Sequence, residues 1–441
     1  MQPEAVLDHI PAGADVIVPM ANGEPVTLLD TLEAHNERLQ GVRVHQMHAL
    51  HERPYIHGAY GDRLRHVSYF LSAATRQAYW EGTCDLVPAN FSEMPAILER
   101  CTKSTVVLAA ASPPDKHGHF SLGTNAEYVA RLIGRVPFVL EVNPRMPRTM
   151  GLNQIHTSQI AGWIEAEREL VEVPPAVPDE RDRAIAAKIV ERIPDRATLQ
   201  VGIGGIPNAI LASLKGHTAL GIHTELLADG IMDLVEAGVV TGTYKRLRPN
   251  KVVTTFALGT RKLYDWMDGN SAVELLPVDE VNDPRIVAAE KRFVSINATT
   301  EVDLYGQCAS ETIAGRYWSS SGGQADFARG AMYSEDGQAF VVLHSTTGKG
   351  RSRIRVALTP GSVVTTLKNT VDNVVTEHGL AELRGVTLAE RARRLIGIAA
   401  PEHRDELERE AQAAGMLSRP VAVPAAAPTD GRVERPSAPA G

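Results

Sequence analysis

The sequence of 441 residues has few cysteines and no long apolar run. Its three cysteines, Cys84, Cys101 and Cys308, are odd in number and have no C-x-x-C spacing, which fits unpaired thiols in a reducing compartment. No run of about 18 apolar residues occurs, so we expect no transmembrane helix and no membrane partner. The N-terminus lacks basic residues before an apolar core and is not a secretory signal. These absences predict a cytoplasmic protein.

Positive charge is also scarce. The formal net charge is −8, which argues against nucleic acid as a main partner. Aromatic residues make up only 5% of the chain and give no hint of an aromatic substrate. By contrast, 44% hydrophobic and 22% charged residues are enough for two substantial cores.

Two patterns suggest ligand sites that we do not expect to exist. The segment 42–45 reads as a strand, and a three-residue spacing alternates across the faces of a strand, so the nearby histidines should not converge on a metal. These histidines are His45, His48, His51 and His57. The segment Thr347-Gly348-Lys349-Gly350-Arg351-Ser352 lacks the Ser or Thr that directly follows the lysine in an ATP-binding loop. We therefore expect neither a metal nor ATP.

A glycine-rich turn follows the strand-like segment 198–201. Gly202, Gly204 and Gly205 allow a sharp turn and a close approach of a ligand to the main chain. Pro207 fits the first turn of a helix that begins near Asn208. The turn could cradle a phosphate or a pantetheine arm, or it could serve packing alone. Because proline stands at 207, the spacing is not the dinucleotide pattern, and NAD is disfavoured.

Glu225 is a carboxylate placed just before an amphipathic helical run. Thr224 could cap that helix, and an acidic residue in a first turn suits the helix dipole. For an isolated glutamate this capping role would be the more probable interpretation. The surrounding motifs change that balance.

The chain resembles the family I coenzyme A-transferases, in the branch of acetyl-CoA hydrolase/transferases and 4-hydroxybutyrate CoA-transferases. The resemblance covers nearly the whole chain up to about residue 417. The segments that carry it are Ser112-Pro113-Pro114-Asp115-Lys116-His117-Gly118-His119-Phe120-Ser121-Leu122-Gly123, Gly202-Ile203-Gly204-Gly205-Ile206-Pro207-Asn208-Ala209, His223-Thr224-Glu225-Leu226-Leu227-Ala228-Asp229-Gly230, Val294-Ser295-Ile296-Asn297-Ala298, Glu301-Val302-Asp303-Leu304-Tyr305-Gly306-Gln307, Gly322-Gly323-Gln324-Ala325-Asp326-Phe327-Ala328-Arg329-Gly330-Ala331, Val374-Val375-Thr376-Glu377-His378-Gly379 and Leu383-Arg384-Gly385.

The resemblance implies a role for each candidate site residue. Glu225 would be the nucleophile, and the main-chain N–H groups of Gly322 and Gly323 would stabilise a developing oxyanion. A purely conformational role for these two glycines stays open, as does a role of Lys349 as a solvated loop residue. The implied CoA-contacting residues are Gly202, Ile203, Gly204, Gly205, Ile206, Asn297 and Lys349.

The chemistry implied for Glu225 is a double displacement. Attack on an acyl-CoA would give an acyl–glutamyl anhydride, and the released thiolate would convert it into a glutamyl–CoA thioester. A second carboxylic acid would then reverse these steps, with ping-pong kinetics. Coenzyme A is thus expected as a substrate, together with a small carboxylate.

Alternating strand-like and helical segments predict an α/β protein. The resemblance implies two related open α/β domains with the active site between them. We place an N-terminal domain at 1–175, a C-terminal domain that carries the nucleophile and CoA loop at 176–417, and a disordered, Pro- and Ala-rich tail at 418–441. The expected strands are 15–20, 42–50, 64–70, 104–112, 137–143, 198–201, 252–258, 293–298, 339–344 and 363–367. The expected helices are 25–39, 73–82, 125–134, 180–193, one after Glu225, 388–398 and 403–417.

Three alternatives to a CoA-transferase remain open from the sequence. An acyl-CoA hydrolase would use the same residues with water as acceptor. A noncatalytic CoA or nucleotide sensor would use the same cradle, and a sugar-phosphate isomerase of related fold would not require the segment around Glu225. Segments near 68–72, 90–93 and 117–121 are expected to shape the acyl pocket. Acetate, succinate, propionate, butyrate and 4-hydroxybutyrate all remain possible substrates, and the family resemblance favours a homo-oligomer.

Overall fold

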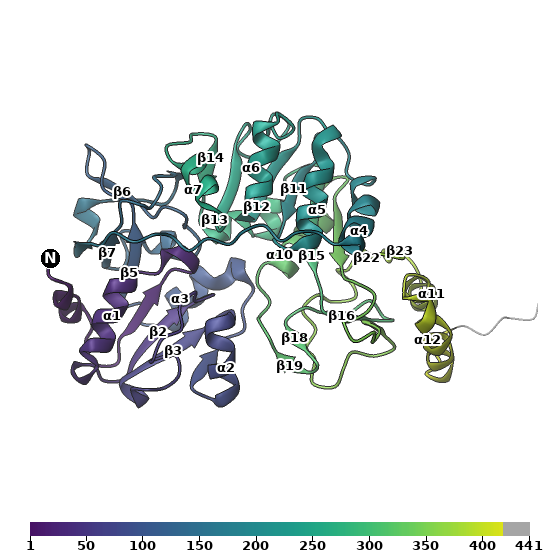
Figure 1. Cartoon of the computed structure of the whole chain (residues 1–441), viewed down its shortest axis with the longest axis horizontal. Coiled ribbons are helices and arrows are strands. Elements are labelled where there is room, and N and C mark those ends of the chain that lie inside the picture. The colour runs from purple at the N-terminus through teal and green to yellow at the C-terminus, as the bar shows by residue number, and fades with distance from the viewer. Residues whose placement is uncertain (418–441) are drawn as a thin grey trace, which may run out of the picture.

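The computed structural model describes residues 1–417 and contains two large, mostly parallel β-sheets flanked by helices (Figure 1). The predicted α/β class is confirmed. The tail predicted to be disordered, 418–441, lies outside the described residues. Within residues 1–417, every helix is too short or too polar to span a bilayer.

The N-terminal sheet has seven parallel strands in the order β10-β7-β5-β1-β2-β3-β4. Val16 of the central strand lies opposite Val44 on one side and Val106 on the other. The strands are β1 (Asp15–Val18), β2 (Val42–Gln46), β3 (Leu64–Ser68), β4 (Cys84–Leu86), β5 (Val106–Ala111), β7 (Phe138–Val142) and β10 (Gly162–Glu165). The α-helices of this part are α1 (Val26–Ala34), α2 (Ala73–Glu81) and α3 (Met94–Cys101).

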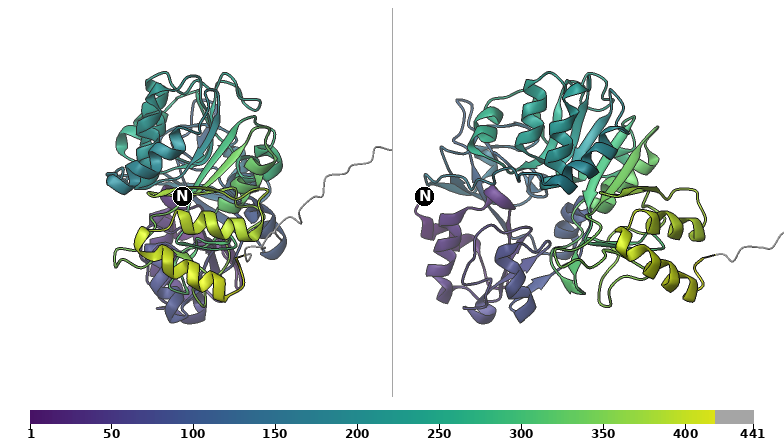
Figure 2. Two further views of the ribbon diagram at one scale, coloured as in Figure 1. Left: turned by 90° about the vertical axis from the view of Figure 1, so that its right-hand side faces the viewer. Right: turned by 45° about the vertical axis from the view of Figure 1, so that its right-hand side comes forward.

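The C-terminal sheet has nine strands in the order β23-β22-β20-β15-β11-β12-β13-β14-β8, of which only β23 runs antiparallel to its neighbour. The strands are β8 (Met150–Gly151), β11 (Thr198–Val201), β12 (Gly221–Leu227), β13 (Val252–Ala257), β14 (Val273–Leu275), β15 (Phe293–Ala298), β20 (Gln338–Val342), β22 (Asn373–Thr376) and β23 (Gly379–Glu382). The helices are α4 (Glu180–Val190), α5 (Gly205–Ser213), α6 (Asp229–Glu236), α7 (Arg261–Met267), α8 (Val278–Val281), α9 (Pro284–Val287), α10 (Gln324–Tyr333), α11 (Leu388–Gly397) and α12 (Pro401–Ala413). Helices α11 and α12 pack together at the end of the molecule, beyond β23 (Figure 2).

The two sheets follow the same winding order. Apart from the edge strand β8, the first strand of each sheet (β1 or β11) is central, the next three large-sheet strands extend to one side, and the later strands extend to the other. Ligands of such open sheets bind at the carboxyl ends of the strands, where the winding direction reverses. The topology therefore marks two crevices, one beside β1 and one beside β11.

Short strands and 3₁₀-helices complete the described chain. The strands are β6 (His119–Ser121), β9 (Gln154–His156), β16 (Glu301–Asp303), β17 (Cys308–Ala309), β18 (Thr312–Ile313), β19 (Arg316–Tyr317) and β21 (Ile354–Arg355). The 3₁₀-helices are η1 (Pro3–His9), η2 (Ala21–Gly23), η3 (Asn36–Arg38), η4 (Gly61–Arg63), η5 (Phe91–Glu93), η6 (Val129–Leu132), η7 (Thr157–Gln159) and η8 (Leu214–Gly216).

Three predicted elements differ from the structure. Segment 125–134 forms only the short turn η6, because Asn125 bridges to Phe256 and the two residues after Asn125 donate their N–H groups to the Thr255 carbonyl. Segment 363–367 makes a single bridge, Cys308 to Thr366, and the sheet is extended by β22 instead. The helix predicted at 25–39 ends at Ala34 and is followed by η3.

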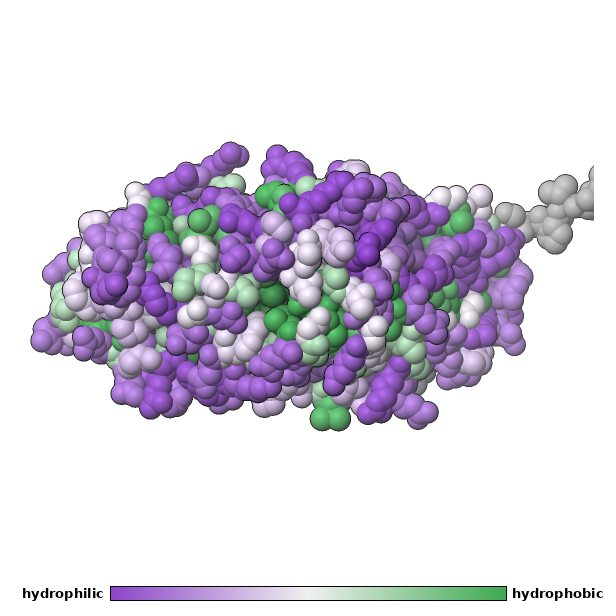
Figure 3. Space-filling view, turned by 90° about the horizontal axis from the view of Figure 1, so that it is seen from above, coloured by the Kyte–Doolittle hydropathy of each residue, from purple (hydrophilic) through white to green (hydrophobic). Residues whose placement is uncertain are grey.

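Apolar packing continues from one sheet to the other. Leu226 and Phe256, next to the C-terminal sheet's crevice, share a buried cluster with Met20, Met47 and Phe91 of the N-terminal part. Helices with one apolar side cover the outer faces of the sheets, and the face seen from above is accordingly mostly hydrophilic, with smaller hydrophobic areas toward its middle (Figure 3).

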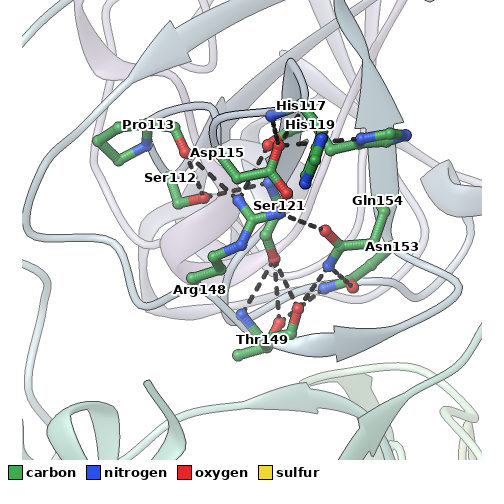
Figure 4. Close-up of polar contacts among 10 residues, drawn as sticks. All are labelled: Ser112, Pro113, Asp115, His117, His119, Ser121, Arg148, Thr149, Asn153 and Gln154. Atoms are coloured by element: carbon green, nitrogen blue, oxygen red, sulfur yellow. Dashed lines mark hydrogen bonds and ion pairs between the residues drawn. The ribbon is translucent and has the colours of Figure 1, made fainter. Parts of the chain in front are cut away.

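A polar network around Arg148 fixes the chain where it passes from one sheet to the other (Figure 4). The Arg148 guanidinium donates to the carbonyl of His119 at 2.9 Å, to Asp115 Oδ2 at 3.0 Å and to Gln154 Oε1 at 3.0 Å. Two residues later, β8 pairs with β14 at the edge of the C-terminal sheet. The part of the chain before residue 175 thus also supplies a strand to the second sheet.

Candidate active site

The carboxyl ends of strands from both sheets face one cavity of about 330 Å³. Residues that follow β1, β2 and β3 form one wall, and residues at the ends of β11, β12 and β15 form another. The lining residues are Met20, Met47, His48, Phe70, Gln200, Val201, Gly202, Ile203, Glu225, Leu226, Phe256, Leu258, Asn297, Ala298, Ser310, Ser319, Ser320, Ser321, Gly322, Gly323 and Gln324.

Glu225 lies within strand β12, not at the start of a helix. The following helix, α6, begins only at Asp229. Thr224 is fully buried and its hydroxyl donates to the Val201 carbonyl at 3.2 Å, so the alternative in which Thr224 caps the helix does not apply. Successive side chains of a strand point to opposite faces, so the buried Thr224 side chain points away from the cavity and the Glu225 side chain points toward it.

Two hydrogen-bond donors hold the Glu225 carboxylate. Asn282 Nδ2 donates to Oε2 at 2.7 Å, and the Gly323 main-chain N–H donates as well. Burial raises the pKa of Glu225 to about 7, although both hydrogen bonds act in the opposite direction. The carboxylate is therefore oriented, only partly hydrated and easily protonated near neutral pH.

The loop before α10 needs glycine at both of its predicted site positions. Gly322 has a φ of +55° and faces the Phe70 ring, whose Cε2 would lie 3.3 Å from an added Cβ. A Cβ at Gly323 would overlap both Glu225 Oε2 and Asn282 Nδ2. Side chains here would push the N–H donor away from the carboxylate. The close approach of Glu225 and Asn282 to the main chain therefore requires glycine at position 323.

Asn282 was not found by sequence reasoning, because it comes from a turn 57 residues after Glu225. It follows α8, and the His223 ring contacts the carbonyl of the adjacent Val281 at 2.7 Å. His223 lies two residues before Glu225 in the same strand. Burial holds the pKa of His223 down to about 3, so the ring is neutral. The sequence before it, Val-Asp-Glu-Val, gives no local signal for Asn282.

A second buried carboxylate stands behind the glycine loop. Asp326 in the first turn of α10 accepts from Ser92 Oγ at 2.8 Å and from the Ser92 main-chain N–H at 3.0 Å. Burial, with a smaller contribution from the charge of Glu225, raises the pKa of Asp326 to about 7. Nearby, the Phe91 N–H donates to the Gly322 carbonyl at 3.0 Å. The N-terminal part of the chain thus fixes the loop that contacts Glu225.

The predicted CoA turn is only partly at the cavity. Gly202 and Ile203 line it, whereas Gly204, Gly205 and Ile206 form the start of α5 behind them. Gly204 has a φ of +123°, and Pro207 lies in the first helical turn as expected. A Cβ at Gly205 would overlap the Asp182 carboxylate of α4. Packing alone therefore requires one of these glycines.

Asn297 lines the cavity, and Lys349 does not. The Asn297 amide is held by Gln200, with Nδ2 donating to Gln200 Oε1 at 3.0 Å. Lys349 lies in an exposed loop after β20. The structure thus brings Asn297, but not Lys349, beside Glu225.

The N-terminal wall carries strained backbone. His48 and Ala21 have φ values of +49° and +50°, a region that non-glycine residues rarely adopt. The Ala21 N–H donates to the His48 carbonyl, so the two strained residues support each other beside Met20 and Met47. Burial lowers the pKa of His48. The sequence suggested His48 only as a member of a histidine cluster, and the structure places it at the cavity.

The segment 117–121 does not line the cavity, so the expectation that it shapes the acyl pocket is not met. Its residues instead stabilise the strand pair β6–β9 and the Arg148 network (Figure 4). Among residues 1–417, one group has the spacing to hold a metal ion: Asp179, Asp182 and His344. All three members are engaged within the protein: Asp179 and Asp182 form the capping box of α4, and Asp182 pairs with His344 at 2.7 Å.

Comparison with known proteins identifies the family of this chain. The sequence models of the acetyl-CoA hydrolase/transferase N-terminal and C-terminal domains match residues 1–175 and 259–411. The chain belongs to the acetyl-CoA hydrolase/transferase family, whose members are CoA-transferases and acetyl-CoA hydrolases, and it is therefore an enzyme that acts on CoA thioesters.

Individual relatives cover almost the whole chain. A 4-hydroxybutyrate coenzyme A transferase of Clostridium kluyveri is 41% identical over 92% of this chain and 96% of its own. A succinyl-CoA:cyclohexane-1-carboxylate CoA transferase of Geobacter metallireducens is 40% identical over 91% and 92%. The crystal structure of RipA from Yersinia pestis superposes with a TM-score of 0.89 at 34% identity, covering 95% of this chain and 98% of that one. An acetyl-CoA hydrolase of Saccharomyces cerevisiae matches 51% of this chain and 44% of its own at 31% identity.

Proposed function

We propose that the protein is a CoA-transferase that moves coenzyme A from an acyl-CoA to a small carboxylic acid, with Glu225 as the nucleophile. The observation that carries the proposal is the Glu225 carboxylate itself, oriented by two donors at the end of a strand and facing a cavity between the two sheets. Relatives named as CoA-transferases over nearly the full chain support it.

The reaction begins when a Glu225 oxygen attacks the thioester carbonyl. A bond forms between that oxygen and the acyl carbon, the C–S bond breaks, and CoA leaves as a thiolate. The thiolate then attacks the Glu225 carbonyl carbon, the anhydride C–O bond breaks, and the first acid leaves as its carboxylate. A second carboxylate runs the same steps in reverse and departs as its CoA ester, which restores Glu225.

The surroundings fit each requirement of this scheme. Burial makes the carboxylate less hydrated and more basic, which favours attack. Asn282 and the Gly323 N–H are placed to stabilise negative charge on the glutamyl carbonyl group when it is acylated. Gly202, Ile203 and Asn297 would contact the pantetheine end of CoA at the cavity.

The lining favours short monocarboxylic acids. Met20, Met47, Phe70 and Phe256 present apolar surface, and among the described lining residues there is no Lys or Arg to pair with a second carboxylate. His48 is held neutral by burial and offers only a hydrogen bond. We therefore propose acetate, propionate or butyrate as substrates in preference to succinate.

Trapping of the covalent intermediate tests the proposal. Incubation with acetyl-CoA in the absence of an acceptor acid is expected to give a CoA adduct that peptide mass spectrometry locates on Glu225. Glu225→Gln is expected to lose both the adduct and the exchange, since an amide is not a nucleophile. Full exchange activity in this folded variant would refute the role of Glu225. Propionate, butyrate and succinate as alternative acceptors test the pocket.

A further inference from the structure

Several contacts join the walls of the cavity, among them the bonds from Phe91 to Gly322 and from Ser92 to Asp326 described above. On one side the connection is main chain: β8 pairs with β14, and Asn125 bridges to Phe256. On another side it consists of side chains from helix α2 against the hairpin β18–β19, which lie side by side below the centre of Figure 1. We call this second contact the clasp, made of Arg76 and Trp80 of α2 with residues 316–318 of the hairpin.

The clasp consists of two interlocked cation–π pairs. The Arg76 guanidinium lies 3.7 Å from the centroid of the Trp318 ring, and that of Arg316 lies 4.2 Å from the Trp80 ring. Hydrogen bonds run in the same direction, from Arg76 Nε to the Trp318 carbonyl at 2.8 Å and from Trp80 Nε1 to the Tyr317 carbonyl at 2.9 Å. The Trp318 side chain is still 41% exposed, so the clasp lies at the surface.

Each half of the clasp is directly connected to the cavity lining. Trp318 is followed by Ser319, Ser320 and Ser321, which line the cavity and lead to Gly322 and Gly323. On the other half, α2 begins three residues after Phe70, which also lines the cavity. Separation of α2 from the hairpin would therefore move two lining segments apart and admit water beside Glu225.

Water at this position would compete with the acceptor acid. Its oxygen would attack the carbonyl carbon of the glutamyl–CoA thioester, the C–S bond would break, and the thiolate would take up a proton from the attacking water. The products are the Glu225 carboxylic acid and free CoA thiol, which amounts to hydrolysis of the acyl-CoA.

We propose that the clasp between α2 and the β18–β19 hairpin excludes bulk water from the glutamyl thioester and so decides how much of the reaction is transfer and how much is hydrolysis. This inference rests on the proposed function. It assigns to Arg76, Trp80, Arg316 and Trp318 a role in reaction specificity rather than in binding or chemistry. A weak surface contact suits this role, because its strength can change without altering the site.

The test measures hydrolysis and transfer in the same protein. Thiol release from acetyl-CoA without acceptor gives hydrolysis, and butyryl-CoA formation with saturating butyrate gives transfer. In Arg76→Ala and Trp318→Ala we expect the ratio of hydrolysis to transfer to rise about tenfold, which corresponds to about 1.4 kcal/mol in the opening equilibrium. Trp318→Phe keeps an aromatic face for Arg76 and is expected to stay near the wild-type ratio.

A matched control is the cation–π pair of Arg196 and Tyr244, 4.4 Å apart and formed by residues outside the cavity lining. Tyr244→Ala is expected to leave the ratio unchanged. An unchanged ratio in folded Arg76→Ala and Trp318→Ala, while the Glu225 adduct still forms, would overturn the role of the clasp alone. Absence of both adduct and transfer in the wild type would instead overturn the proposed function. In ¹⁸O-labelled water, label in the Glu225 side chain would identify the glutamyl thioester as the species hydrolysed.

Discussion

Two carboxylates with raised pKa values lie near each other beside the cavity. Burial is the main cause that raises the pKa of Glu225 to about 7, and burial together with the nearby charge of Glu225 raises the pKa of Asp326 to about 7. Their other partners differ, since Glu225 is held by Asn282 and Gly323, and Asp326 by Ser92. A glutamate of this kind is a stronger base than one in water, at the cost of being partly protonated at neutral pH.

The pH dependence of adduct formation follows from these values. Glu225 must be ionised to attack, so the rate is expected to rise with pH through a midpoint near 7 and to be about one tenth of its plateau at pH 6. Asp326→Asn removes a neighbouring negative charge that disfavours ionisation of Glu225, so the midpoint should move to lower pH. Stopped-flow measurement of thiol release over about pH 5–9 gives the midpoint for the wild type and for Asp326→Asn.

Asp265→Asn is the control for this experiment, because it removes an exposed carboxylate that pairs only with Arg261 at the surface. Its profile should coincide with that of the wild type. A midpoint that stays in place in Asp326→Asn would show that the two carboxylates do not interact through charge.

Sequence motifs pointed to Glu225, the residue that we propose as nucleophile, but not to the residues that hold it. The placement of Glu225, Gly323, Gly202 and Asn297 at one cavity agrees with the motif-based prediction. Asn282 and Asp326 act through single side-chain contacts formed only by the folded chain, and no local pattern distinguishes them from ordinary loop and helix residues. Lys349 has a motif-like setting and yet lies outside the cavity lining.

At the scale of elements, three segments meet behind the glycine turn. Asp182 of α4 pairs with His344 after β20, and its carboxylate occupies the space beside Gly205 at the start of α5. The pair is mostly buried, with 21% of the His344 side chain and 10% of the Asp182 side chain exposed. It therefore fixes the turn that carries Gly202 and Ile203 to the cavity.

His344→Ala is expected to raise the KM for acetyl-CoA with little change in kcat, because it loosens the turn without touching Glu225. Loss of one charge-assisted hydrogen bond, about 1.5–3 kcal/mol, corresponds to an increase of about tenfold or more. Steady-state kinetics at saturating acceptor measure the two parameters separately. His35→Ala, which removes a surface contact to Glu37, should change neither. An equal fall in kcat would indicate that the pair supports the chemistry itself.

Periodicity located most of the regular elements and failed where tertiary contacts decide the backbone. Segment 363–367 has the composition of a strand, but its N–H groups at Thr365 and Thr366 both donate to the Cys308 carbonyl, which leaves only one bridge. Segment 125–134 is drawn out of a helix by its bonds to Thr255. Neither partner is visible from the local sequence.

At the scale of the whole molecule, we expect the segment around Arg148, where the chain passes from one sheet to the other, to contribute to the free energy of unfolding. Arg148 makes three short hydrogen bonds there, with only 26% of its side chain exposed. Arg148→Ala is expected to lower the free energy of unfolding by about 1–3 kcal/mol, since three partly buried acceptors lose a donor. Urea denaturation followed by circular dichroism measures the loss.

The comparison variant is Arg135→Ala, which removes a pair with Glu99 in which both side chains are more than half exposed. Its effect should stay within about 0.5 kcal/mol. Equal effects of the two substitutions would mean that the Arg148 network contributes no more than an ordinary surface ion pair.

Because the two sheets share one winding order and face the same cavity, each sheet supplies a different set of lining residues. The C-terminal sheet supplies Glu225 and the glycine turn, and the segments after the N-terminal strands supply Met20, Met47, His48 and Phe70. Under the proposed function, mutations in the first half of the gene would change part of the acid-facing wall while the second half keeps Glu225 and the groups that hold it. Such a division lets a lineage diversify its metabolism by altering one half at a time.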